Sequence, residues 1–269
     1  MDARTPLSGG QQRYLITLRR ELRVVRLSRA GLFLFFLLLW ESTAQKGILD
    51  SFIFSSPSLI LSAFLRMIKD GSLLTHTGVT LFETLLSFAL VTVLGIGIAL
   101  FLWCFPRLAS VLEPYLVILN SLPKSALAPL LIVWLGSNMR TIVVAGISVA
   151  IFGAVLNLYT GFEETDPDKL KLIKTLKGTR KDALFQVVLP ASVPLSFSIM
   201  KVNIGLCLIG VVIGEMIGSK EGLGYLIIYS SQVFQLTPMI LAIFILCVIA
   251  VLLYSLITIA EKQYLKKRA

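Results

Sequence analysis

Long runs of apolar residues alternate with short polar segments along the chain. The runs lie at about residues 27–44, 80–104, 109–135, 140–160, 192–217 and 237–259. A helix that crosses the ~30 Å hydrocarbon core of a bilayer needs ~20 mostly apolar residues, because each residue adds ~1.5 Å to its length. Each run meets that length, so the pattern predicts an all-α membrane protein with six transmembrane helices.

Lysine and arginine gather in three of the polar segments: residues 1–26, residues 163–189 and residues 261–269. In a six-span arrangement these three segments lie on the same side of the membrane. Basic residues in short segments mark the cytoplasmic side, and attraction to anionic lipid is a further sufficient reason for the arginines near the N-terminus. Both termini and the 163–189 segment are therefore predicted to be cytoplasmic.

The polar segment between the first two runs, residues 45–79, falls on the outer side in this arrangement. Its apolar residues recur at helical spacing after Pro57, and Arg66 and Lys69 polarise one face. The helix is too short to span a bilayer, so it is expected to lie flat on the membrane surface. His76, the only histidine, is expected at the surface of an external loop.

The composition of the 269 residues agrees with a membrane protein, since 56% are hydrophobic and 15% are charged. Soluble domains carry about 25% charged residues. The net charge of +10 does not indicate nucleic-acid binding, because the basic residues lie between the apolar runs and membrane topology explains them. Cys104, Cys207 and Cys247 are scattered, which predicts neither a metal site nor a disulfide framework.

Motifs that carry catalysis are missing from the sequence. It contains no G-x-x-x-x-G-K-[ST] phosphate-binding loop, no H-E-x-x-H zinc motif and no G-x-S-x-G nucleophile elbow. The chain is therefore not expected to be an enzyme, and no cofactor is expected in it. Uphill transport would draw its energy from a partner protein or from an ion gradient.

The 163–189 segment carries signals for two short helices. An aspartate, a proline and a second aspartate form a helix start at residues 166–168. Apolar residues then follow at three-residue steps, Gly178 is expected to break the helix, and a second short helix is expected to run as far as residues 189–190. A rigid cytoplasmic knob of this kind suits docking into a groove of another protein; the alternative is an ordinary solvated loop.

The stretch from Gly178 to VLPASVP at residues 188–194 resembles the EAA loop of the membrane subunits of ATP-binding-cassette (ABC) importers. In that family the loop has a glycine followed by a hydrophobic-Leu-Pro sequence, and it docks on the ATPase subunit. Leu172-Ile173-Lys174 stands where the family has Glu-Ala-Ala. By this resemblance the ATPase-coupling residues are Asp168, Leu170, Ile173, Lys174, Leu176, Gly178, Thr179, Leu189 and Pro190.

Further motifs resemble the nitrate, sulfonate and taurine branch of these importers, whose relatives import pyrimidine-type vitamin precursors and riboflavin. They are LNSLPKSALAPL at residues 119–130, IVWLG at 132–136, GEM at 214–216 with GLGYLI at 222–227, SPS at 56–58, and TL with ET at 80–84. Several motifs in the same order are more specific than any one alone. The resemblance covers roughly residues 50–260.

The resemblance implies a type I importer permease core at residues 80–260, which includes the coupling loop and follows a first helix and external segment at 27–79. It implies a permease subunit that moves a small solute inward by alternating access. That solute would be a nitrate-, sulfonate- or taurine-like anion or a vitamin precursor.

The same resemblance implies partners and a location. The partners are a second permease copy forming a homodimer, cytoplasmic ATPase subunits that hold ATP and Mg²⁺, and an extracytoplasmic solute-binding protein. The location is the inner or plasma membrane of a prokaryote. The alternative function is a stand-alone secondary transporter acting as a dimer, although the two halves of the chain show no persuasive inverted repeat.

Polar residues within apolar runs are costly in a bilayer and are therefore candidates for function. Those predicted to line the translocation path or gate are Asn120, Ser121, Lys124, Glu215 and Met216. The alternatives are an ordinary proline kink, a lysine that snorkels, or a hydrogen bond to neighbouring backbone. Lys201 is expected to snorkel or to pair with Glu113, and Glu83 is expected to be a boundary acid at a helix N-terminus.

Glycines recur every four residues in the fifth run, at Gly210, Gly214 and Gly218. Small residues at this spacing let two helices approach closely. The spacing predicts close packing, either within one subunit or across a dimer.

Overall fold

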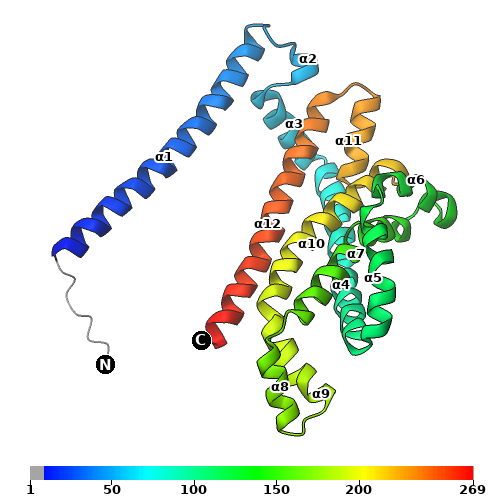
Figure 1. Cartoon of the computed structure of the whole chain (residues 1–269). Helices are drawn as coiled ribbons and strands as arrows, with labels where there is room; N and C mark the ends of the chain where they lie inside the picture. The colour runs from blue at the N-terminus through cyan, green and yellow to red at the C-terminus, as the bar shows by residue number, and fades with distance from the viewer. Residues whose placement is uncertain (1–8, 269) are drawn as a thin grey trace. The chain divides into compact units, whose positions relative to one another are not determined.

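The computed structural model describes residues 9–268 (Figure 1). Residues 1–8, which open the predicted basic segment 1–26, and residue 269, which ends the segment 261–269, lie outside the described residues. The described part contains helices and no strand, which confirms the predicted all-α class. The chain divides into two compact units, one up to Ser62 and one from Ala63.

The first unit contains α1 (Gly9–Gln45), α2 (Ser51–Phe54) and the start of α3 (Pro57–Lys69). The predicted first apolar run lies within α1. Glu41 near the end of α1 accepts hydrogen bonds from the backbone N–H of Ser58 at 3.0 Å and from its hydroxyl at 2.8 Å. Because a carboxylate is favourable at a helix N-terminus, this contact fixes α1 to the start of α3.

Helix α3 begins at Pro57, as the sequence predicts. The hydroxyl of Ser56 accepts a hydrogen bond from the N–H of Leu59 at 3.3 Å, which satisfies one of the free donors of the first turn. The position of α3 on the membrane surface stays a prediction.

A tight turn connects α3 to α4 (Ser72–Cys104), with Gly71 at a φ of 77°. Asp70 accepts hydrogen bonds from the hydroxyl and the backbone N–H of Ser72 at 2.6 and 2.9 Å, and these bonds lower the pKa of Asp70. The helix begins before the predicted start at residue 80. His76 therefore lies inside a helix, and its expected place in an external loop is wrong.

Helices α4, α7 (Met139–Glu163) and α10 (Leu189–Gly218) form the centre of the second unit. A Cβ at Gly146 of α7 would lie 2.6 Å from Ser87 Oγ on α4 and 2.9 Å from Val211 Cγ2 on α10. The Ser87 hydroxyl donates to the carbonyl of Val143 at 3.2 Å. The backbone of α7 is thus held tightly between its two neighbours.

The predicted third span at residues 109–135 is broken into α5 (Pro106–Ser121) and α6 (Lys124–Leu135), which meet at 93°. The break falls at Leu122 and Pro123. A proline disfavours helical backbone at the residue before it, and Leu122 has an extended conformation with ψ 138°. The sharp break thus falls at one of the three prolines, Pro114, Pro123 and Pro129, that interrupt the predicted third span.

Four helical segments of residues 9–268 are long and apolar enough to cross a membrane: Ser72–Cys104, Met139–Glu163, Arg180–Gly218 and Leu236–Lys267. The bent pair α5 and α6 would make a fifth. Six crossings and two cytoplasmic termini stay predictions.

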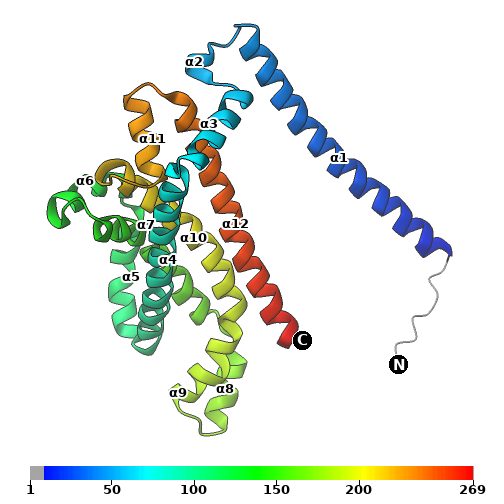
Figure 2. The same cartoon turned by 180° about the vertical axis from the view of Figure 1, so that it is seen from behind.

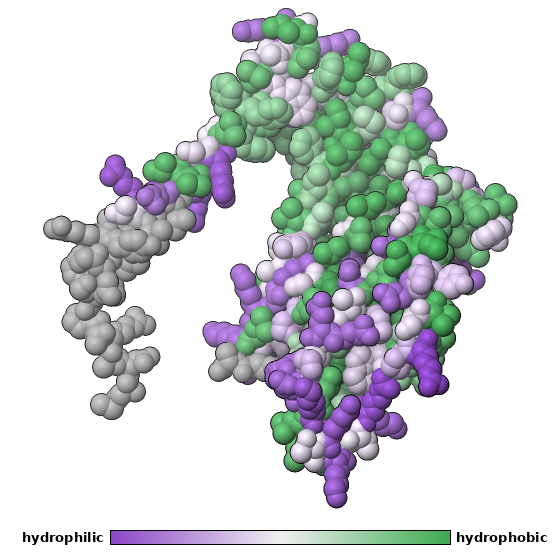
Figure 3. Space-filling view, in the orientation of Figure 1, coloured by the Kyte–Doolittle hydropathy of each residue, from purple (hydrophilic) through white to green (hydrophobic). Residues whose placement is uncertain are grey.

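Between α7 and α10 lie α8 (Pro167–Thr175), α9 (Arg180–Ala183) and a π-helical turn (Leu184–Val188). After α10 come α11 (Leu223–Gln232) and α12 (Leu236–Arg268), and α12 packs along α10 in both views (Figures 1 and 2). Apolar residues cover the middle of the second unit, whereas hydrophilic residues gather at the end that carries α8 and α9 (Figure 3).

Candidate functional site

The start of α8 is built as the sequence predicts. The side chain of Asp166 accepts the backbone N–H of Asp168 at 2.9 Å, and Pro167 occupies the first turn. Lys171 forms an exposed ion pair with Asp168 at 3.0 Å. The Asp166 cap fixes where the helix begins, because it satisfies a backbone N–H that the helix itself leaves free.

The corner after α8 differs from the expected glycine break. The helix ends at Thr175, and the left-handed residue is Lys177, with a φ of 57°. The N–H of Gly178 bonds the carbonyl of Ile173 at 2.9 Å, and the N–H of Lys177 bonds that of Lys174 at 3.0 Å. This is a Schellman motif, so the glycine does not itself supply the left-handed turn.

Gly178 is needed at this corner for space. A Cβ there would lie 2.6 Å from Ile173 Cγ2 and 3.0 Å from the carbonyl oxygen of Ile173. Any side chain at this position would push the corner away from α8.

The start of α9 is fixed by a capping box. The carboxylate of Asp182 accepts the backbone N–H of Thr179 at 2.7 Å, and the hydroxyl of Thr179 accepts the N–H of Asp182 at 3.3 Å. Each residue satisfies a backbone donor of the other. The corner between α8 and α9 is therefore fixed on both sides.

Arg180 joins this corner to the end of α4. Its guanidinium donates to the carbonyl of Trp103 at 2.9 Å and lies 5.2 Å from the centre of the Trp103 ring. Such cation–π contacts add to the hydrogen bond. In the sequence, Arg180 is only one of several charges in a basic segment. Its contact with Trp103 could not be predicted, because the two residues lie far apart along the chain.

The sequence predicted that the second short helix ends at Leu189 and Pro190, but in the structure the helix continues past them. α9 continues through the π-helical turn into α10, and the N–H of Leu189 bonds the carbonyl of Leu184. Pro190 has no N–H and sits in the first turn of α10, where a proline is tolerated. The α8–α9 segment is consequently continuous with the central helix α10.

The apolar residues of this segment face two ways. Leu170 and Ile173 are partly buried, and Leu170 packs against a buried cluster formed mainly by α4, α7 and the π-helical turn. Leu176, Leu172 and Phe185 instead expose 71%, 58% and 66% of their surface. Leu172 and Phe185 were missed as candidates, because a helical period drawn through Leu170 and Ile173 selects the inward face.

A hollow of about 440 Å³ lies between the end of α4 and the α8–α9 corner. It is lined by Trp103, Leu170, Ile173, Lys174, Gly178, Thr179, Arg180 and Ala183. Five of the predicted coupling residues therefore share one surface, whereas Asp168 and Leu176 lie exposed and Leu189 and Pro190 belong to the start of α10.

A second group of polar residues surrounds Glu215 at the other end of α10. Glu215 is fully buried, and its carboxyl accepts the N–H of Gly224 at 2.6 Å. Gly222 has a φ of 102°, and a Cβ at Gly224 would lie 2.5 Å from the carbonyl oxygen of Val212. The glycines at 222 and 224 thus let the chain wrap closely around this carboxyl.

One face of α4 meets this turn. His76 Nδ1 accepts the N–H of Gly222 at 3.1 Å, and Thr80 Oγ1 accepts the N–H of Leu223 at 2.8 Å. Glu83, one turn further on, is 2% exposed and interacts with the carboxyl of α10. Glu83 therefore lies well inside α4, and its interpretation as a boundary acid at a helix start is wrong.

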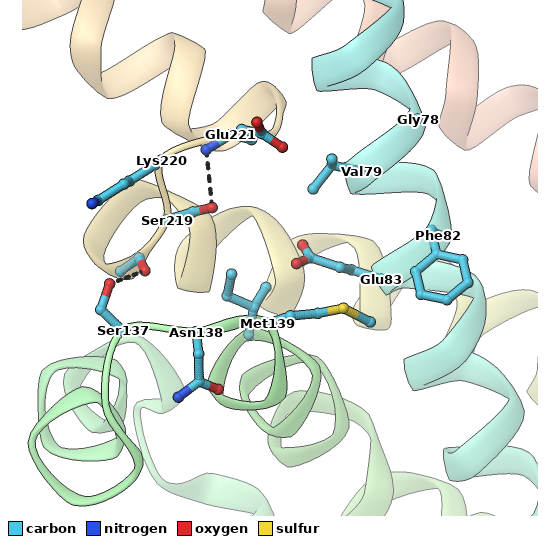
Figure 4. A pocket seen from close by; sticks show the side chains of 12 residues that line it. Gly78, Val79, Phe82, Glu83, Ser137, Asn138, Met139, Ser219, Lys220 and Glu221 are labelled. Atoms are coloured by element: carbon cyan, nitrogen blue, oxygen red, sulfur yellow. Dashed lines mark hydrogen bonds between the residues drawn. The ribbon is translucent and has the colours of Figure 1, made fainter.

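A cavity of about 530 Å³ opens beside Glu83 (Figure 4). Its wall comprises Gly78, Val79, Phe82 and Glu83 of α4, Ser137, Asn138, Met139 and Ile142 around the start of α7, and Gly218, Ser219, Lys220 and Glu221 after α10. The Glu83 carboxyl points into the space between these three elements (Figure 4). We call this space the Glu83 cavity.

The predicted path residues of the third run lie at the α5–α6 bend. Lys124 Nζ donates to the carbonyl of Asn120, and the Ser121 hydroxyl donates to that of Val117 at 2.9 Å. A Cβ at Gly153 of α7 would lie 3.3 Å from the Asn120 side chain. These residues form one group, whereas Glu215 and the partly buried Met216 belong to the group beside α11.

Lys201 pairs with Glu261 and not with Glu113. Its ammonium lies 2.5 Å from the Glu261 carboxylate, and both side chains are 15% exposed. α10 packs against α12 along this face, so the nearest acid is the one that α12 carries.

The fifth-run glycines face other helices of the same chain. A Cβ at Gly210 would lie 2.8 Å from the Ala145 carbonyl oxygen, and one at Gly214 would lie 3.2 Å from Ile142 Cα. One at Gly218 would lie 2.8 Å from Ile132 Cδ1 of α6. These positions are filled by α7 and α6, so packing within one subunit accounts for the glycines.

Known proteins are similar to this chain in sequence. Residues 91–267 match the family described as "Binding-protein-dependent transport system inner membrane component". A probable ABC transporter permease protein of Haemophilus influenzae is 34% identical over 219 residues, which cover 81% of this chain and 88% of that protein. A formylaminopyrimidine transport permease protein of Halalkalibacterium halodurans is 28% identical over 193 residues, 72% of this chain and 76% of that protein.

Solved structures agree in fold. The chain resembles one in the crystal structure of an amino acid ABC transporter with histidines, with a TM-score of 0.60 and 19% identity over 74% of this chain and 98% of that one. It also resembles a chain of the inward-facing MetNI methionine ABC transporter, with a TM-score of 0.60 and 17% identity over 72% of this chain and 94% of that one. The chain belongs to the family of binding-protein-dependent transport system inner membrane components, and it is an ABC importer permease subunit that crosses the prokaryotic inner membrane several times.

Proposed function

We propose that two copies of this chain form the pathway of an ATP-driven importer. Two cytoplasmic ATPase subunits dock on the α8–α9 segments, and an external solute-binding protein delivers the solute. ATP and Mg²⁺ are held by the ATPase subunits. Each copy crosses the membrane six times, and its basic segments 1–26 and 261–269 face the cytoplasm.

The observation that carries this proposal is the exposure of large apolar side chains on a polar segment whose helix ends are fixed. Leu172, Leu176 and Phe185 are exposed on helices whose ends are fixed by a cap, a Schellman motif and a capping box. Burying such side chains in a partner is favourable by ~25 cal/mol per Å² of apolar surface. The basic residues around them set the segment apart from the apolar helices, which suits a water-exposed docking site.

The segment is connected so that its movement reaches the membrane core. α9 continues into α10 through the π-helical turn, and Arg180 attaches the corner to the end of α4. When ATP closes the two ATPase subunits, they pull the two α8–α9 segments together. The spans then reorient from inward-open to outward-open.

Two groups of polar residues serve the solute in this proposal. Asn120, Ser121 and Lys124 at the α5–α6 bend line the path, and Glu215 with Met216 belongs to the outer gate. Relatives carry the names of permeases for aliphatic sulfonates, taurine, nitrate and formylaminopyrimidine, so the proposed solute is a small anion or a vitamin precursor.

Gly178→Asp tests the docking role. The new Cβ would lie 2.6 Å from Ile173 Cγ2, so the corner must shift, and we expect loss of transport with the protein still in the membrane. Gly205→Ala is the matched control, because a Cβ at Gly205 meets nothing within 4 Å. The measurement is solute uptake together with co-purification of the ATPase in mild detergent.

Normal uptake and a normal ATPase yield for Gly178→Asp would contradict the docking role. A homo-oligomer that purifies without any ATPase would contradict the importer assembly. A stand-alone secondary transporter, the alternative raised by the sequence, has no feature in its favour beyond the count of apolar helices.

A further inference from the structure

The hollow of about 440 Å³ between the end of α4 and the α8–α9 corner, which we call the corner hollow, is lined by two cations. They are Lys174 of α8 and Arg180 of α9. Within residues 9–268 no acidic side chain lines the hollow, and Lys174 forms no ion pair in this part of the chain. Because a concave surface lined by one sign of charge attracts the opposite sign, the corner hollow favours an anion.

Arg180 is oriented by Trp103 without losing its charge. The guanidinium donates to the carbonyl of Trp103 at 2.9 Å and lies 5.2 Å from the centre of the Trp103 ring. A guanidinium has five N–H donors, so this contact leaves donors for a second acceptor. Asp182, the acid of the same corner, accepts two hydrogen bonds from Thr179 and belongs to the capping box. Arg180 forms no ion pair within the described chain, so its charge is available to a ligand.

The corner hollow lies where two segments that can cross the membrane end. Trp103 is the last residue but one of the candidate span Ser72–Cys104, and Arg180 is the first residue of the candidate span Arg180–Gly218. Residues 85–104 carry no charge, and ~20 apolar residues cross the hydrocarbon core, so the core ends close to Trp103. Tryptophan is typical of this boundary. The corner hollow therefore faces the layer of lipid headgroups, at the end of the second unit where hydrophilic residues gather (Figure 3).

The corner hollow is separate from the apolar side chains proposed to dock on the ATPase. Lys174 follows Leu172 by two residues, which places the two side chains ~200° apart around α8. Leu172 and Leu176 are exposed, whereas Leu170 and Ile173 are partly buried and line the hollow. An ATPase that contacts the outward face of α8 therefore has no need to occupy the hollow.

The apolar part of the wall favours a lipid over a soluble anion. It comprises Trp103, Leu170, Ile173 and Ala183. A free phosphate ion would leave this apolar surface in contact with water, whereas a phospholipid covers it with its glycerol and the upper part of its acyl chains. Basic pockets between membrane helices on the cytoplasmic side are also a known setting for anionic headgroups.

We propose that the corner hollow binds the headgroup of an anionic phospholipid, with Lys174 and Arg180 on its phosphate and Trp103 against its glycerol. The inference goes beyond the proposed function, because it requires neither an ATPase nor a transported solute. A free phosphate ion carries the same charge, and an acidic side chain of the ATPase is a different partner, so the test includes both.

The test uses Trp103 as the probe of its own site. The full chain with Trp40→Phe and Trp134→Phe, which keeps one of its three tryptophans, is placed in phosphatidylcholine vesicles that contain a brominated phospholipid. Bromine quenches a nearby tryptophan, so quenching by brominated phosphatidylglycerol and by brominated phosphatidylcholine gives the relative binding constant of the two lipids at Trp103. We expect a constant well above one. Lys174→Gln should lower it about fivefold, the effect of one basic residue near an anionic lipid.

Two controls separate a site from general attraction between the basic segment and the membrane. Lys169→Gln removes the same charge from the face of α8 that carries Leu172, where Lys169 is exposed and does not line the hollow, and it should leave the constant unchanged. A chain that keeps only Trp134, which is exposed on α6 and does not line the hollow, should give a constant near one.

A relative binding constant near one at Trp103 overturns the inference, and so do equal constants at Trp103 and Trp134 or for the Lys174 and Lys169 variants. Loss of the preference when inorganic phosphate is added at constant ionic strength would assign the hollow to a free phosphate ion. Loss of the preference when the ATPase is added would assign it to the docking interface. Either of these results also overturns the lipid assignment. An ATPase that fails to bind contradicts the proposed importer and leaves the lipid measurement unaffected, so the two proposals can fail separately.

Discussion

The ion pair between Lys201 and Glu261 offers a sharp test of how α10 and α12 are held together. Both side chains are 15% exposed, and no other ion pair joins two helices of the described chain. Lys201→Met removes the cation, so the largely buried carboxylate of Glu261 loses its charged partner. The double variant Lys201→Met/Glu261→Leu removes both charges and keeps apolar side chains of similar size.

The two variants should differ in how much they lower the free energy of unfolding. Breaking a fully buried ion pair costs ~3–5 kcal/mol, whereas an exposed pair contributes ~0–1 kcal/mol. At 15% exposure the single change should cost about 2–3 kcal/mol, between these limits and nearer the buried one. The double variant should lie within about 1 kcal/mol of the unaltered protein, because no charge is left without a partner.

The assay is thermal unfolding in detergent, followed by tryptophan fluorescence. For a domain of this size ~1 kcal/mol shifts the melting temperature by ~2–4 °C, so Lys201→Met should melt about 4–12 °C lower, and the double variant should recover most of that loss. Lys262→Met is the control, because Lys262 is exposed on the same helix. A melting temperature for Lys201→Met equal to that of the control, or a double variant less stable than the single one, would refute the reasoning.

Two further predictions follow from close contacts. Gly210→Ala should lower the melting temperature by several degrees, because its Cβ would lie 2.8 Å from backbone atoms of α7 and overpacking costs ~1–3 kcal/mol. Gly205→Ala is the control and should leave the melting temperature unchanged. Equal melting temperatures for the two variants would contradict the tight contact between α7 and α10. Arg180→Met should weaken ATPase affinity about three- to tenfold, since it removes the Trp103 contacts that keep the corner ready for docking. Titration of the ATPase onto immobilised permease measures this affinity. An unchanged Kd would mean that the contacts between Arg180 and Trp103 do not position the α8–α9 segment.

Features set by neighbouring residues could be predicted from the sequence. The helix starts at Pro57 and Pro167 follow from a proline in the first turn and a polar cap before it. The apolar runs predicted the long helices, because the length of a run and its lack of charged residues suffice for that inference. The position of the third-run break is also local, since Pro123 carries it, but the angle of 93° depends on what α6 packs against.

Features that depend on distant partners could not be predicted. The stretch LLTHTGVT looked like a loop because its histidine, threonines and glycine interrupt the apolar run. In the structure it is the first part of α4, where His76 and Thr80 each accept a backbone N–H from the turn before α11. Nothing near these residues in the sequence shows that the donors lie at Gly222 and Leu223.

The two carboxyl groups and the docking segment lie on the same two helices. α4 carries Glu83 in its first half and Trp103 near its last residue, and α10 begins after the π-helical turn and carries Glu215 near its far end. Both pack closely on α7, at Gly146, Gly210 and Gly214, and close-packed interiors transmit strain. In the proposed mechanism, a pull on the α8–α9 corner therefore reaches two sides of the Glu83 cavity, the one formed by α4 and the one formed by the turn after α10.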